Sequence, residues 1–142
     1  IHSLAELYVK SRDEGFVTEN KRRIMIGSYV LSSGFFDAYY LQAQKVRTLL
    51  INQFDELFEN YDVLLSPTAP TPAFGFGENT DNPIKMYLSD AMTVPASLAG
   101  IPALSIPAGE TADGLPVGVQ LMAKRKDDAR MLALAREMEA SL

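Results

Sequence analysis

Cysteine is absent from the 142-residue sequence, and histidine occurs once, at His2. Without cysteine, the chain has no disulfide bond and no thiolate for a zinc site or for covalent catalysis. A single histidine near the N-terminal end cannot assemble a histidine-based metal or catalytic site. We therefore expect no metal site and no thiol chemistry in this chain.

Long hydrophobic runs are also missing. No stretch approaches the roughly 18 consecutive apolar residues of a membrane helix, and the N-terminal residues lack the order typical of a secretion signal. We expect a cytoplasmic protein without a membrane span. Because the sequence starts at Ile1 and stops at Leu142 inside a helical pattern, we expect a fragment of a longer protein.

Basic residues are in the minority, 13 against 18 acidic residues, for a formal charge of −5. This balance gives no bulk attraction for nucleic-acid phosphates, so any RNA contact is local or belongs to a partner. The length and the 47% hydrophobic content suit one domain. We expect a single domain, helical to about residue 60 and built from strands and loops over 61–142.

Three helices are predicted in the first part, over residues 3–13, 19–32 and 35–60. Thr18 stands where its side chain would cap the second helix. The third helix carries an apolar stripe at helical spacing, which we expect to be buried. Its members are Tyr39, Val46, Leu50, Phe54 and Leu57.

Shorter elements are predicted after Tyr61. Residues 62–65 resemble a buried strand, and the prolines that follow predict a loop over 67–77 of the kind that often lines sites. A helix is expected over 84–92, and adjacent strands over 104–107 and 116–122 around Asp113-Gly114. Asp127 or Asp128 begins a last helix. This succession favours an α/β fold.

Few residues offer chemistry. Ser32-Ser33-Gly34 contains hydroxyls, but the sequence places no base beside them, and we interpret the segment as a helix end. Arg23 and Asp90 are charges in mostly apolar or small-residue surroundings, where burial without a partner is costly. Together they would hold the carboxylate and the ammonium of an amino acid. Surface charges or a mutual ion pair are the alternatives.

Several motifs occur in an order that resembles the A subunits of the glutamyl-tRNA(Gln)/aspartyl-tRNA(Asn) amidotransferases, which belong to the amidase signature family. The matching segments are KRRIMIG (21–27), LSSGFFDAYY (31–40), AQKVRTL (43–49), YDVLLSPTAPTPAF (61–74), MYLSD (86–90), PASLAGIPALSIP (95–107) and GLPVGVQL (114–121). The later segments are shared by many amidases, whereas the KRR and AYY blocks indicate the tRNA-dependent subunits.

The resemblance implies the C-terminal portion of the amidase-signature fold, with a mixed β-sheet flanked by helices. It implies a parent that hydrolyses glutamine and passes ammonia to a complex with subunits B and C, where a partner uses ATP and Mg²⁺ to amidate a mischarged tRNA. By analogy, Arg23 meets the α-carboxylate of glutamine and Asp90 its α-amino group. The family's catalytic lysine and two serines have no counterpart here, so we expect no catalytic residue and no activity in this chain alone.

Two positions depart from the family pattern. Ser97 stands where asparagine is common, and Ala108 where cysteine often follows Ser-Ile-Pro. Two other functions remain open. The chain is part of a general amidase for other amides, which needs no clamp at Arg23 and Asp90, or it is a non-catalytic module that binds partner subunits or tRNA.

Overall fold

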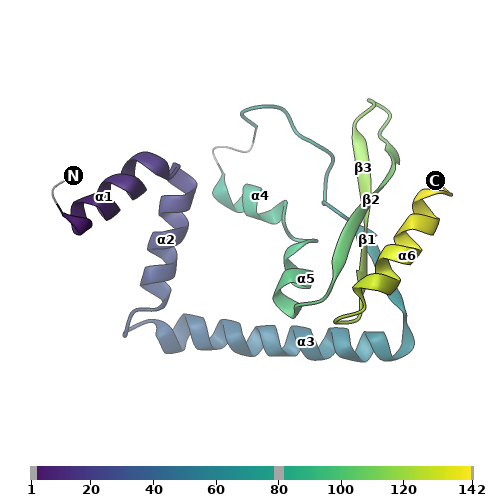
Figure 1. Ribbon diagram of the computed structural model, residues 1–142, viewed down its shortest axis with the longest axis horizontal. Coiled ribbons are helices and arrows are strands. Elements are labelled where there is room, and N and C mark those ends of the chain that lie inside the picture. Colours follow the sequence, from purple (N-terminus) through teal and green to yellow (C-terminus); the bar gives the residue numbers. More distant parts are fainter. Residues whose placement is uncertain (1–2, 79–81, 142) are drawn as a thin grey trace. The chain divides into compact units, whose positions relative to one another are not determined.

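The computed structural model describes residues 3–78 and 82–141, so His2 lies outside the described residues. The chain divides into two compact units, residues 1–46 and 47–142. Figure 1 shows the order of the elements along the chain. The predicted change from helices to strands and loops near residue 61 does not coincide with this boundary, and the prediction of a single domain stays a prediction.

The first unit contains α1 (Leu4–Gly15), α2 (Thr18–Val30), the π-helix η1 (Phe36–Leu41) and the start of α3 (Gln42–Asn60). Two predicted details are wrong. The backbone of Thr18 is already helical and Val17 is the N-cap residue, so the Thr18 hydroxyl caps nothing. The helix predicted over 35–60 is divided into η1 and α3, although it ends at Asn60 as predicted.

No side chain between residues 3 and 46 is buried. The predicted burial of Tyr39 and Val46 is therefore wrong, because the described residues of this unit leave both side chains exposed. Its aromatic side chains stack on one another instead. The ring centroids of Tyr29 and Phe35 are 4.1 Å apart, and those of Phe36 and Tyr40 are 4.9 Å apart.

The second unit contains a three-stranded antiparallel sheet in the order β1-β3-β2. The strands are β1 (Val63–Pro67), β2 (Ala103–Glu110) and β3 (Pro116–Ala123). The predicted pairing of the two later strands is confirmed, and Gly114 in the turn between them has φ +77°. Because β1 is an edge strand, it is half-buried rather than buried as predicted.

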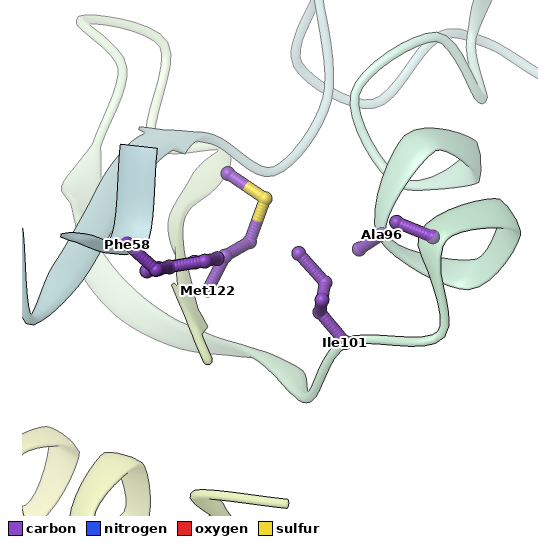
Figure 2. Packing of buried hydrophobic residues seen from close by; sticks show 5 residues of the cluster. Phe58, Ala96, Ile101 and Met122 are labelled. Carbon is purple, nitrogen blue, oxygen red and sulfur yellow. The ribbon is translucent and has the colours of Figure 1, made fainter. Parts of the chain in front are cut away.

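Helices cover both faces of this sheet. On one face, α6 (Asp128–Glu139) packs Met131 and Ala135 against Leu121 of the central strand. On the other, Met122 meets side chains of α3, of α5 (Val94–Ala99) and of the chain that follows α5, as Figure 2 shows for Phe58, Ala96 and Ile101. The α/β class, with a sheet flanked by helices, is confirmed; the described strands pair antiparallel.

The buried stripe of α3 differs from the predicted one. Phe54 packs on the core as expected, but the other contacts come from Ile51 and Phe58, and Leu57 is exposed. The separations of three and four residues place Ile51, Phe54 and Phe58 on one face of the helix, and Leu57 lies off that face.

Two short helices connect β1 to β2. In α4 (Pro83–Leu88), the Asn82 side chain accepts from the N–H groups of Ile84 and Lys85. This helix ends before the predicted residue 92, and the separate helix α5 follows a turn over 89–93. No helix in the described part of the chain is long and apolar enough to cross a membrane.

Candidate functional site

Arg23 projects from α2 with its side chain 62% exposed. Its Nε donates to Oε1 of Glu19 at 3.0 Å, and the neighbouring Arg22 donates from Nη1 to Oε2 of the same carboxylate at 2.7 Å. The expected apolar surroundings are therefore wrong here, because this turn of α2 is exposed and supplies a carboxylate four residues earlier. The Glu19 contact orients a guanidinium that solvent reaches.

Asp90 lies in the turn between α4 and α5. Its backbone carbonyl accepts from the N–H groups of Thr93 and Val94 at 3.1 and 3.0 Å. The side chain is exposed, so the expected cost of burying this charge does not arise. Among the described residues, the Asp90 carboxylate makes no hydrogen bond or ion pair. The turn thus holds the backbone and leaves the carboxylate available to a ligand.

Arg23 belongs to the first unit and Asp90 to the second. The expected convergence of the two side chains therefore stays a prediction. Ser32 follows the C-cap residue of α2, close to the helix end expected there, and its Oγ donates to the Tyr29 carbonyl at 2.7 Å. That contact gives the hydroxyl a structural partner.

A row of polar side chains crosses one face of the sheet, and sequence reasoning did not identify it. Gln120 of β3 stands opposite Ser66 of β1 and Ser105 of β2. It is only 4% exposed, and its Nε2 donates to Ser66 Oγ at 3.1 Å and to the Met92 carbonyl at 2.9 Å. The signal in the sequence is an amide inside an otherwise apolar strand.

Two surface pockets lie beside this row of polar side chains. One, of about 310 Å³, is lined by the proline-rich loop over 67–73 and by Gly118. The other, of about 280 Å³, is lined by Thr93, Ser97 and Gln120 among others. The hydroxyls of Thr68 and Ser105, 2.6 Å apart, border both. Because every lining side chain is uncharged, these pockets suit water or a neutral polar group rather than an ion.

No group of three or more histidine, aspartate or glutamate residues that could hold a metal ion occurs in residues 3–78 and 82–141. The two departures from the family pattern lie at the surface. Ser97 is exposed on α5, and Ala108 is exposed on β2 next to a register shift between Pro107 and Glu110.

Known proteins resemble this chain over nearly its whole length. The A subunit of the glutamyl-tRNA(Gln) amidotransferase of Koribacter versatilis is 54% identical over 140 residues, which are 99% of this chain and 29% of that protein. The protein of the same name from Heliobacterium modesticaldum is 58% identical over 136 residues, 96% of this chain and 28% of the relative. The chain thus spans less than a third of the relatives' length.

Solved structures agree in fold. The crystal structure of the glutamyl-tRNA(Gln) amidotransferase A subunit from Thermotoga maritima matches with a TM-score of 0.71 at 42% identity, over 95% of this chain and 29% of that one. A crystal structure described as an amidase matches with a TM-score of 0.73 at 26% identity, over 96% and 31%. The family model for amidases matches residues 1–132. The chain therefore belongs to the amidase family.

Proposed function

We propose that this chain is the C-terminal portion of the glutamine-hydrolysing A subunit of a tRNA-dependent amidotransferase. The observation that carries the proposal is the level of identity: 54–58% to proteins named as A subunits of glutamyl-tRNA(Gln) amidotransferases, against 26% to a structure described only as an amidase. The fold itself does not discriminate, since the two TM-scores are 0.71 and 0.73.

In this proposal Arg23 and Asp90 hold the two ends of the glutamine backbone. The planar guanidinium of Arg23 donates to the α-carboxylate, and the Asp90 carboxylate accepts from the α-ammonium group. Each charge-assisted hydrogen bond contributes about 1.5–3 kcal/mol of binding. The exposure of both side chains and the absence of a described partner for the Asp90 carboxylate support this role.

The chain would bind substrate without cleaving it. The catalytic lysine and serines lie in the part of the parent that precedes this chain, and subunits B and C, the tRNA, ATP and Mg²⁺ act elsewhere in the complex. The described residues offer no carboxylate cluster for Mg²⁺. The isolated chain should release no ammonia from glutamine.

Substitution of Arg23 in the full-length parent tests the clamp. Arg23→Ala should raise the KM for glutamine about 10- to 100-fold in a glutaminase assay, because a charge-assisted contact to the substrate is lost. Arg22→Ala is the matched control, since Arg22 pairs with the same Glu19. An unchanged KM in Arg23→Ala would contradict the clamp.

A second pair of variants tests Asp90 in the same assay. Asp90→Asn should raise the KM for glutamine, whereas Asp55→Asn removes an equal charge from an exposed site on α3 and should not. A general amidase is the alternative, and its KM would be insensitive to both Arg23→Ala and Asp90→Asn.

A further inference from the structure

The side chain of Gln120 makes a fixed set of hydrogen bonds inside the second unit. The Met92 carbonyl can only accept, so the amide nitrogen must face it, and the distance is 2.9 Å. The other N–H of the amide meets Ser66 Oγ at 3.1 Å, and that hydroxyl donates onward to the Pro67 carbonyl at 3.1 Å. Because Gln120 is only 4% exposed, water cannot readily replace a hydrogen bond that its amide group loses.

Met92 belongs to the turn that carries Asp90. The backbone hydrogen bonds of this turn are local: the Asp90 N–H donates to the Tyr87 carbonyl, and the Asp90 carbonyl accepts from Thr93 and Val94. Such bonds shape the turn but do not attach it to the sheet. Among the described residues, the hydrogen bond from Gln120 is the one that joins residues 89–93 to the sheet, across 28 positions in sequence.

We infer that Gln120 is a positioning residue, which sets the place of the Asp90 carboxylate by holding the Met92 carbonyl. The inference rests on the proposed function, in which Asp90 accepts from the α-ammonium group of glutamine. In this role Gln120 acts on the turn rather than on the substrate. The contact at Met92, two residues from Asp90, limits the positions of the turn. A carboxylate that is held in place before the ligand arrives loses less conformational freedom on binding.

The test compares glutaminase kinetics among variants of the full-length parent. Gln120→Leu keeps most of the side-chain volume and removes both N–H donors. It should raise the KM for glutamine about tenfold while kcat per folded molecule changes less than about twofold. Ser66→Ala is the control, since it removes the other partner of the amide and leaves the Gln120–Met92 contact in place. Its KM should stay within about twofold of the value for the unaltered parent.

A second measurement separates positioning from general damage to the fold. In Gln120→Leu/Asp90→Asn, the KM should be no higher than in Asp90→Asn alone, because the two changes remove the same interaction. Glutaramate, which is glutamine without the α-amino group, should inhibit Gln120→Leu and the unaltered parent with equal Ki. If Gln120→Leu does not fold, Gln120→Asn, whose amide is too short to reach Met92, replaces it with the same expectations.

The outcomes distinguish this inference from the proposed function. A raised KM in Asp90→Asn with an unchanged KM in Gln120→Leu overturns the positioning role and leaves the clamp standing. Additive effects in the double variant, or a weakened Ki for glutaramate, also overturn it, since both indicate a structural effect unrelated to the ammonium contact. An unchanged KM for glutamine in Asp90→Asn would contradict the proposed clamp itself.

Discussion

Asp13 and Lys21 connect α1 to α2 through one ammonium group. Lys21 Nζ donates to Asp13 Oδ1 at 2.8 Å and to the Asp13 carbonyl at 2.7 Å. The hydrogen bond from Lys21, followed by its charge, lowers the pKa of Asp13 below the ordinary aspartate value. A lowered pKa means that this pair adds stability above the unfolded-state pKa, and that the contribution is lost as pH falls through the folded-state pKa.

We expect Lys21→Gln to raise the pKa of Asp13 toward its ordinary value, measured by NMR titration of the side-chain carboxyl carbon. Lys10→Gln is the control, because it removes an equal charge from α1, where Lys10 pairs with Glu6. Added salt should shrink the difference between Lys21→Gln and the unaltered chain, since both partners are solvated. Equal Asp13 titrations in Lys21→Gln and the unaltered chain would contradict the ion pair.

Glycine is needed at position 118 because a larger side chain would clash with its neighbours, not because of its backbone conformation. A Cβ atom at this position would lie 2.6 Å from Ser105 Oγ and 3.0 Å from Thr68 Oγ1, the two hydroxyls that bond to each other. We expect Gly118→Ala to lower the free energy of unfolding by about 1–3 kcal/mol, because the hydroxyl pair must separate. Urea unfolding monitored by circular dichroism measures this change.

A double variant shows whether the clash is the cause. Gly118→Ala combined with Ser105→Ala should lose less stability than the sum of the single losses, since the nearer oxygen is gone. If the losses of the two single variants add up to the loss of the double variant, the contact with Ser105 Oγ is not the cause of the destabilisation by Gly118→Ala.

The central strand β3 packs against the helix α6. Leu121 is 0% exposed and lies in the cluster with Met131 and Ala135. Truncation of Leu121 to alanine leaves a cavity between the sheet and α6, and we expect it to reduce the free energy of unfolding by about 2–5 kcal/mol. Leu132→Ala on the exposed side of α6 should change it by less than about 0.5 kcal/mol. Similar losses in both variants, by urea unfolding, would contradict the assigned packing.

The short helix α5 illustrates what local sequence cannot specify. It has six residues, too few for stability by itself. The carbonyls of Leu98 and Ala99 near its C-terminal end accept from Arg47 at 2.7 Å and Arg125 at 3.1 Å, residues distant in sequence. We predicted no helix at this position, because the residues that complete α5 lie far from it in the chain.

At the scale of the whole molecule, the two units differ in their cores. The second contains two clusters of buried side chains, whereas residues 3–46 contain no buried side chain. We therefore expect amide hydrogens of α1 and α2 to exchange with deuterium orders of magnitude faster than those of β3, because opening α1 or α2 exposes little new apolar surface. Hydrogen exchange followed by mass spectrometry of the isolated chain measures this. Equal protection in both units would contradict it.

Sequence by itself determined the family resemblance, most helix and strand positions and several turns. Local chemistry is sufficient for these: Asn82 and Pro83 begin a helix, Gly114 allows a tight turn, and the apolar spacing of Met131 and Ala135 defines the buried side of α6. Arg23 and Asp90 were selected from their apolar and small neighbours in sequence and then by the resemblance; both side chains are exposed, and their role stays a prediction.

Only the tertiary structure decided which face of α3 is buried and which polar side chains form hydrogen bonds inside the second unit. Phe58 rather than Leu57 enters the core, β3 lies between β1 and β2, and Gln120 reaches Met92. Each outcome depends on a contact between segments far apart in the chain. The free energy of such contacts comes from packing and desolvation after the segments meet. A local pattern of residues therefore does not specify which distant segment will pack against it.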